Sequence, residues 1–147
     1  MNQLADFKKF GSDALGRRTI ERDFANGTTQ TIYAGNTIET HNPLGHVTQH
    51  IFDVAVGQIE TRDALSGVTR ISLDSAGNVT GRVDSLGHST TYQYNSRNRL
   101  VKVTDASSGE TLLRYDLAGN VVSRKDALLN EVQYEYDVLG RKIKETQ

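Results

Sequence analysis

Residues 115–120 read YDLAGN, and residues 136–141 read YDVLGR, which is the same pattern 21 residues later. When the chain is aligned on the residue that opens each of these turns, four consecutive steps have this length. The opening residues are Asp53, Asp74, Asn95, Asp116 and Asp137. A constant period of this kind is the sequence signature of a repeat architecture.

The repeat continues toward the N-terminus with two irregular turns. Asp13 and Gly16 belong to a turn of the same kind, 40 residues before Asp53, which is one period of 21 and one of 19. The intervening turn, at residues 32–36, is shortened by two residues, and the turn that Asp53 opens is one residue longer than its neighbours. We therefore predict a local shift of strand register or a β-bulge beside each of these two irregular turns.

A second column of turns follows the first at a distance of ten residues. Its opening residues are Asp23, Asn42, Asp63, Asp84, Asp105 and Asp126. Asp or Asn at this position can accept hydrogen bonds from backbone N–H groups two residues further on. Gly or Asn three or four places later can adopt a positive φ and close a hairpin.

The segments between successive turns have the length and composition of β-strands. About five to seven residues remain for each, which is the usual strand length. Residues 91–94 (TYQY) and 132–136 (VQYEY) alternate large and polar side chains, as a two-faced strand does. A short helical turn is predicted only for residues 3–10. We therefore predict an all-β chain of about twelve antiparallel strands in a curved sheet, with an N-terminal segment at 1–11 and a single repeat array of about six repeats at 12–147.

A single-layer sheet of this kind has surfaces that remain uncovered. Its apolar positions need a cover, and its two outer strands leave open edges. The apolar positions include Val101, Val103, Leu113, Tyr115, Val122 and Ile143. The chain is therefore expected to be part of a larger assembly or to associate with itself.

Composition excludes several classes of function. The 17 basic and 18 acidic residues give a net charge of −1, without the basic excess typical of nucleic-acid binding. No run of the sequence approaches the ~18 apolar residues of a membrane helix, and residues 1–11 lack the apolar core of a signal peptide. The absence of cysteine excludes disulfides, thiol nucleophiles and cysteine-ligated zinc.

Residues that could carry chemistry are better explained as parts of turns. His41, His46 and His50 lie close in sequence, but four residues of a strand span about 13 Å, which is too far for one metal ion. The aspartate columns offer one carboxylate per turn, whereas calcium takes about 6–8 oxygens. No Gly-x-Ser-x-Gly elbow or phosphate-binding glycine loop is present. We expect no catalytic residue, no cofactor and no metal.

The tyrosines cluster directly before the turns and allow two interpretations. Across neighbouring hairpins they could form an aromatic ladder. Alternatively, a tyrosine strip could bind sugars or peptides, because the ring is apolar and its tip is polar. The strip would consist of Tyr92, Tyr94, Tyr134 and Tyr136. Arg17, Arg99 and Arg141, which follow the turns, are expected to form a solvated rim.

Residues 113–141 resemble the YD repeat of the Rhs family, in which Tyr-Asp-x-x-Gly is followed by Arg or Asn, then by Asp-x-x-Gly, and then by Tyr-x-Tyr-Asp. The resemblance extends over the whole repeat region, and its best matches are residues 115–120 and 134–141. The signature residues in this chain are Asp13, Gly16, Asp53, Asp74, Gly77, Tyr94, Asn95, Tyr115, Asp116, Gly119, Tyr136, Asp137 and Gly140.

The resemblance implies a fold and a role. In Rhs effectors, Tc toxin complexes and teneurins, such repeats form a strip of hairpins that spirals into a hollow shell, which in the bacterial proteins sequesters a toxic C-terminal domain. The resemblance thus implies a non-catalytic wall segment whose partners are the rest of a shell and its toxin domain, or further copies joined through sheet edges. It also implies a bacterial protein, cytoplasmic until a secretion system exports it or delivers it to the surface.

The chain departs from the family pattern in extent. It has about six repeats, whereas a closed shell needs many more, and it shows no counterpart of the plug, the autoproteolytic segment or the toxin domain. The alternative is a β-repeat module that binds carbohydrate or a surface protein. An enzyme has less support, because no pocket-forming insertion interrupts the 21-residue period.

Overall fold

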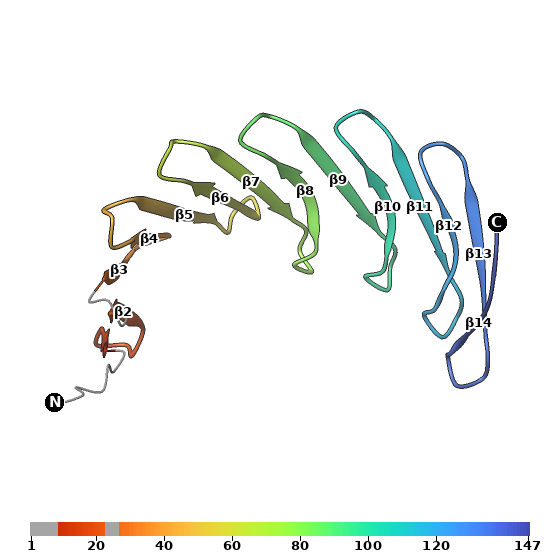
Figure 1. Ribbon diagram of the computed structural model, residues 1–147, viewed down its shortest axis with the longest axis horizontal. Coiled ribbons are helices and arrows are strands. Elements are labelled where there is room, and N and C mark those ends of the chain that lie inside the picture. Colours follow the sequence, from red (N-terminus) through yellow and green to blue (C-terminus); the bar gives the residue numbers. More distant parts are fainter. Residues whose placement is uncertain (1–8, 23–26) are drawn as a thin grey trace, which may run out of the picture. The chain divides into compact units, whose positions relative to one another are not determined.

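The computed structural model describes residues 9–22 and 27–147. Every regular element in this part of the chain is a β-strand, and the fourteen strands follow one another in the sheet in the order of the sequence (Figure 1). Neighbouring strands pair antiparallel, as residues 110–115 do with residues 121–125 and residues 131–136 do with residues 142–146. The prediction of an all-β hairpin repeat is confirmed. Within the described residues, no helix has the length and apolar character needed to cross a membrane.

The chain divides into two compact bodies, residues 1–70 and 71–147. The N-terminal body contains β1 (Lys9–Ser12), β2 (Arg18–Arg22), β3 (Thr28–Ala34), β4 (Thr37–His41), β5 (Val47–Asp53) and β6 (Gln58–Arg62). The boundary falls within β7 (Val68–Leu73). The C-terminal body contains β8 (Val79–Val83), β9 (Ser89–Tyr94), β10 (Leu100–Thr104), β11 (Glu110–Tyr115), β12 (Val121–Lys125), β13 (Glu131–Tyr136) and β14 (Lys142–Thr146).

The two ends of the array account for the difference from the expected number of strands. Fourteen strands are present instead of about twelve, because β1 precedes the first complete repeat and β14 follows the turn of the seventh. The helical turn expected at residues 3–10 lies mostly outside the described residues, and its last two positions belong to β1. The turn that Asp23 opens also lies outside them. That residues 12–147 act as a single domain stays a prediction.

One turn geometry recurs ten times in the described chain. In the turn 116–120, the Asp116 N–H donates to the Asn120 carbonyl at 3.0 Å, and the Gly119 N–H donates to the Asp116 carbonyl at 3.3 Å. The same two bonds close the turns 13–17, 42–46, 63–67, 74–78, 84–88, 95–99, 105–109, 126–130 and 137–141. Both columns of turns identified in the sequence therefore use the same five-residue loop.

The fourth residue of each such turn has a positive φ, whatever its side chain. Glycine fills this place in six of the ten turns, but Ser66, Asn98, Ser108 and Leu129 adopt it in the other four. The sequence suggested that glycine in the fourth or the fifth place would serve. Gly67, in the fifth place, instead leaves room for the Asp63 carboxylate, whose Oδ2 would lie 2.5 Å from an added Cβ.

Replacing Leu129 with glycine is expected to stabilise the protein. Leu129 has a φ of 69°, and an L-residue with a side chain pays about 1 kcal/mol or more for this conformation. We expect an increase of about 1 kcal/mol in the free energy of unfolding, measured by urea denaturation. Leu128→Gly, one residue earlier, is the matched control and should give no gain. Equal effects of the two changes would contradict the assignment of strain to position 129.

The strand register is interrupted beside four first-column turns. It is continuous beside the second-column turns 42–46, 84–88, 105–109 and 126–130 and beside the two irregular turns. Tyr115 pairs with Val121 while Arg114 pairs with Ser123, so that Val122 is an extra residue opposite the end of β11. The same shift occurs beside the turns 13–17, 95–99 and 137–141. The register is continuous around Gly35–Asn36 and around residues 54–57. The prediction of bulges at the two irregular turns is therefore wrong, because loops of two and four residues close those hairpins without an extra residue.

The described sheet has no hydrophobic core. Within the described residues no hydrophobic side chain is buried, and Ser123, 8% exposed, is the only buried residue. In the C-terminal body the register places Tyr92, Val103 and Thr111 on one face, and Gln93, Lys102 and Leu112 on the other. The fold is therefore stabilised by hydrogen bonds between strands, by its turns and by contacts between repeats. The contacts between repeats are the candidate functional site.

Candidate functional site

The Asp or Asn side chain that opens each turn accepts hydrogen bonds from backbone N–H groups of the same turn. Asp116 Oδ1 accepts hydrogen bonds from the N–H groups of Gly119 at 2.7 Å and Asn120 at 2.9 Å, and its Oδ2 accepts one from the Asn120 side chain at 2.9 Å. These bonds, above all the one from the Asn120 side chain, lower the pKa of Asp116. Asn95 takes the same place through its amide oxygen, which accepts from Arg97 at 2.9 Å and Arg99 at 3.1 Å. The interpretation of these residues as turn caps is confirmed.

Five further turn-opening aspartates also have a lowered pKa. A side-chain bond from the fifth turn residue is the main cause of the lowered pKa of Asp74, Asp84 and Asp126. In Asp137 the main cause of the lowered pKa is the backbone N–H of Arg141. The pKa of Asp13 is also lowered, because the bonds from Arg17 and Leu15 together outweigh the opposing effect of desolvation.

Acid is therefore expected to destabilise the fold. A carboxyl group whose folded pKa is lowered contributes stability above its unfolded pKa of about 3.9, and this contribution is lost as the pH falls through the folded value. The melting temperature, followed by circular dichroism, should fall between about pH 5 and about pH 2. Asp116→Asn is the matched control, because asparagine keeps the acceptor without titrating, and its melting temperature should depend less on pH. A melting temperature that is constant over this range would contradict the prediction.

Each of four tyrosines connects its own repeat to the one before it. The Tyr115 hydroxyl donates to the Leu100 carbonyl at 2.7 Å, and the Tyr136 hydroxyl donates to the Val121 carbonyl at 2.9 Å. Tyr33 and Tyr94 make the same bond, to Arg18 at 3.1 Å and to Val79 at 3.0 Å. In every case the acceptor lies 15 residues earlier and directly follows the first-column turn of the preceding repeat.

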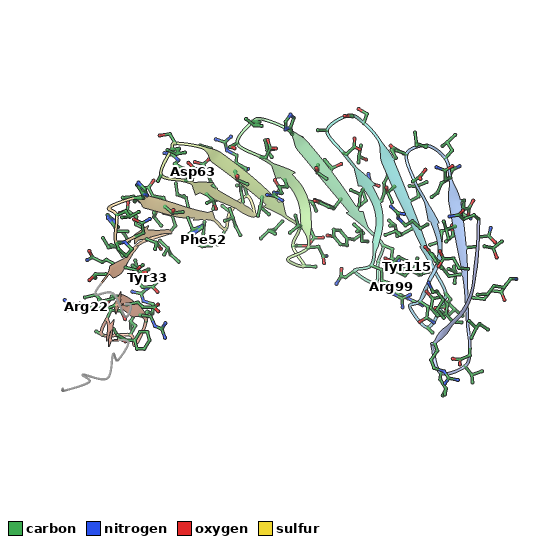
Figure 2. The ribbon with its side chains drawn as sticks, in the orientation of Figure 1. Arg22, Tyr33, Phe52, Asp63, Arg99 and Tyr115 are labelled. Carbon is green, nitrogen blue, oxygen red and sulfur yellow. The ribbon has the colours of Figure 1, made fainter. Side chains whose placement is uncertain are left out.

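The fifth residue of a first-column turn reaches the following repeat. The Arg99 guanidinium lies over the Tyr115 ring, 5.7 Å from its centroid, and donates to the Asp116 carbonyl at 2.9 Å. Figure 2 shows these two side chains next to each other. The Arg17 guanidinium lies 4.2 Å from the centroid of the Tyr33 ring. The expectation of a solvated rim is wrong for Arg99, which is half-buried beside Tyr115, whereas Arg17 remains exposed while it lies over the Tyr33 ring.

One part of the repeat array matches a known family model. Residues 74–111, which include the turn 95–99, match the family model for the RHS repeat. Residues 74–111 are an RHS repeat segment. No curated protein matches it in sequence.

The fold of the chain is similar to that of parts of two solved toxin-complex structures. The crystal structure of TcdB2-TccC3 without its hypervariable C-terminal region has a TM-score of 0.75 and 16% identity, and the match covers 94% of this chain and 9% of that one. The Tc holotoxin pore of Photorhabdus luminescens, with a mutation in TccC3, has a TM-score of 0.54 and 16% identity, with 94% and 7% covered. The chain thus spans less than a tenth of either structure.

In one repeat that lacks the tyrosine, a different side chain makes the connection. Phe52 takes the tyrosine's place and has no hydroxyl group. Instead, the Asn36 side chain of the preceding turn donates to the Phe52 carbonyl at 3.1 Å, and the Phe52 N–H donates to the Asn36 carbonyl at 2.9 Å. The connection between these repeats is therefore maintained although its donor has changed.

The structure separates the four tyrosines of the expected strip into two pairs. The Tyr94 and Tyr136 hydroxyls donate hydrogen bonds to backbone carbonyls of the preceding repeat. Tyr92 lies opposite Val103, and Tyr134 lies opposite Glu145 with the Lys142 ammonium 5.3 Å from its ring centroid. Among the described residues, neither Tyr92 nor Tyr134 has a hydrogen-bond partner for its hydroxyl. Ligand binding by the strip stays a prediction.

The three neighbouring histidines make separate contacts. His50 lies within 3.0 Å of the Thr61 hydroxyl, His46 within 3.4 Å of the Asn42 amide, and His41 within 3.4 Å of Glu39. In the described part of the chain, no group of three or more His, Asp or Glu side chains is arranged to hold a metal ion.

Proposed function

We propose that the chain is a non-catalytic wall segment of an RHS-type shell, and that the complete shell encloses a toxin domain. The observation that carries the proposal is the bond from four tyrosines to the residue that follows the preceding first-column turn, as in Tyr115 to Leu100 at 2.7 Å. A wall built of repeats consists of similar units that contact only their neighbours. Contacts between adjacent units therefore matter more for such a wall than a buried hydrophobic core. The partners proposed are the remaining repeats of the shell and the enclosed domain.

The two faces of the C-terminal body support this role. The face with Tyr92 and Val103 also carries Thr111, whereas the face with Gln93 and Lys102 carries Leu112 as an apolar side chain among polar ones. A wall that separates an enclosed polypeptide from water is expected to differ between its two sides. The fold similarity to TcdB2-TccC3, with a TM-score of 0.75 over 94% of this chain, also supports the proposal.

The proposal is tested by the oligomeric state of the chain. A wall segment with open edges should associate as its concentration rises, which size exclusion with light scattering will detect. Lys144→Pro and Glu145→Pro form a matched pair, because neighbouring residues of a strand direct their N–H groups to opposite sides. In one of the two variants, the proline replaces a residue whose N–H points away from β13. This variant should weaken association without unfolding the sheet. A compact monomer at every concentration would overturn the proposal.

A second candidate function is binding of carbohydrate or a surface protein through Tyr92 and Tyr134. The specific observation in its favour is that these two hydroxyls lack a partner within the described residues, whereas those of Tyr94 and Tyr136 are engaged. In a glycan array, saturable binding that is lost in Tyr134→Ala but kept in Tyr136→Phe would support this function. Absence of saturable binding by the unmodified chain would exclude it for the glycans on the array.

A further inference from the structure

The turn 95–99 differs from the other described turns in the charges that it carries. It opens with the neutral Asn95, which among these turns it shares only with the turn 42–46. Its third place holds Arg97, whereas leucine, alanine or serine fills the third place of all the others. Its fifth place holds Arg99. The turn therefore has two guanidinium groups and no carboxylate.

Because the turn opens with asparagine, the Arg99 guanidinium is not neutralised within it. In the turns 13–17 and 137–141, the arginine in the fifth place binds the carboxylate of the opening aspartate at 2.7 Å. Asn95 cannot form this ion pair, since its amide carries no charge. Arg99 donates one hydrogen bond to the Asp116 carbonyl at 2.9 Å, and a guanidinium has several further donors. These donors remain available to a ligand.

The two arginines line a cavity of about 460 Å³ in the C-terminal body. This volume is within the range of pockets that hold small ligands. Arg97 is exposed, and its guanidinium has no hydrogen-bond or ion-pair partner among the described residues. The Tyr115 ring, which lies beside Arg99 (Figure 2), also belongs to the lining. The rest of the lining includes the apolar side chains of Val101, Leu113 and Leu117.

Asp116 also lines the cavity, but its carboxylate is engaged by its own turn. Its Oδ1 accepts hydrogen bonds from the N–H groups of Gly119 at 2.7 Å and Asn120 at 2.9 Å, and its Oδ2 accepts one from the Asn120 side chain at 2.9 Å. In the described chain this carboxylate forms no ion pair with Arg97 or Arg99. The cavity therefore combines uncompensated guanidinium groups with an apolar wall.

We propose that this cavity binds a carboxylate that is attached to an apolar group. The planar guanidinium of arginine matches the two oxygens of a carboxylate, which would lie between Arg97 and Arg99. The apolar group would lie against Val101 and Leu113. Inorganic phosphate could make similar hydrogen bonds but would leave the apolar wall without a contact. The proposal goes beyond the wall function, because a wall requires neither the arginines nor the cavity.

The proposal is tested with the full, isotope-labelled chain and phenylacetate, a small carboxylate with an apolar ring. Amide chemical shifts are followed by NMR at constant ionic strength, at a chain concentration at which light scattering finds a monomer. We expect saturable shifts in residues 95–99 and at Leu117. Phenylacetamide, which lacks the charge, and inorganic phosphate, which lacks the ring, should each bind at least about fivefold more weakly.

The same chemistry is offered by a small organic acid and by the carboxyl terminus of a polypeptide. An acetylated tripeptide that ends in phenylalanine with a free carboxylate distinguishes these two sources. Tighter binding of the tripeptide than of phenylacetate would identify a polypeptide terminus as the ligand, and the reverse order would identify a small acid. Equal binding of phenylacetate and phenylacetamide, or of phenylacetate and phosphate, would overturn the proposal.

Two arginine variants of the chain locate the ligand in this cavity. Arg97→Ala removes an exposed guanidinium that has no partner among the described residues, and it should weaken the binding of phenylacetate about fivefold. Arg82→Ala is the matched control, because Arg82 is an exposed residue of β8 outside the lining of the cavity, and it should leave binding unchanged. Equal effects of the two variants, or no saturable binding by the unmodified chain, would overturn the proposal.

Asn95→Asp tests the role of the neutral turn opener. The new carboxylate should cap the turn as Asp137 does in its own turn, and should bind Arg99 as Asp137 binds Arg141. We expect the fold to be retained and the binding of phenylacetate to weaken about fivefold. Unchanged binding in this variant would overturn the proposal. None of these outcomes affects the association of the chain, which tests the wall function separately.

Discussion

Tyr115→Ala is expected to lower the free energy of unfolding of the C-terminal body by about 2 kcal/mol. The change removes the bond to the Leu100 carbonyl and the half-buried ring that lies against Arg99. Two adjacent repeats lose their connection as a result, so the effect is larger than that of an ordinary surface truncation. Urea denaturation followed by circular dichroism measures the loss.

Two phenylalanine variants separate the hydroxyl from the ring. Tyr115→Phe keeps the ring beside Arg99 and loses only the 2.7 Å bond, so we expect a loss of about 1 kcal/mol. Tyr92→Phe removes a hydroxyl that has no partner among the described residues and should change the stability by less than about 0.5 kcal/mol. Equal losses in the two variants would show that the bond to the preceding repeat is not stabilising.

Gly119→Val is expected to destabilise the C-terminal body by about 2–3 kcal/mol. Gly119 has a φ of 105°, which a β-branched residue rarely adopts, and an added Cβ would lie 3.2 Å from Cζ of Arg99. The new side chain must therefore strain the turn and displace the arginine that contacts Tyr115. The shift of the urea midpoint relative to the unmodified protein measures both effects together.

Gly77→Val is the matched control for this prediction. Gly77 occupies the same place in its turn with a φ of 84°, but nothing lies within 4 Å of an added Cβ. Its replacement should therefore produce the backbone strain alone and a smaller loss than that at position 119. If Gly77→Val were as destabilising as Gly119→Val, the packing of Arg99 across the repeats would have no measurable effect on stability.

The sequence was sufficient to predict the period, the strands and the role of the turn-opening residues. Each of these features is local: the bonds of the Asp116 side chain connect residues that lie at most four positions apart. The position of positive φ was predicted less well, because Ser66 and Leu129 adopt a conformation for which glycine is the usual indicator. The sequence pattern also could not show the register shifts, which arise beside turns that look regular.

The contacts between repeats were missed because they connect residues that are distant in sequence. A signal for them is nevertheless present. Arg17 precedes Tyr33 by 16 residues, and Arg99 precedes Tyr115 by the same number. Asn78 and Asn120 precede Tyr94 and Tyr136 at this spacing as well. The constant separation of Arg17 from Tyr33 and of Arg99 from Tyr115 would have suggested that these side chains meet across neighbouring hairpins.

The absence of buried hydrophobic side chains from the described sheet has a thermal consequence. The heat capacity change of unfolding arises mainly from newly hydrated apolar surface, and ordinary domains show about 12–15 cal/mol/K per residue. A sheet that hides little such surface should fall below that range. Its stability curve would then be flatter than that of a globular domain of equal length, with little tendency to unfold in the cold.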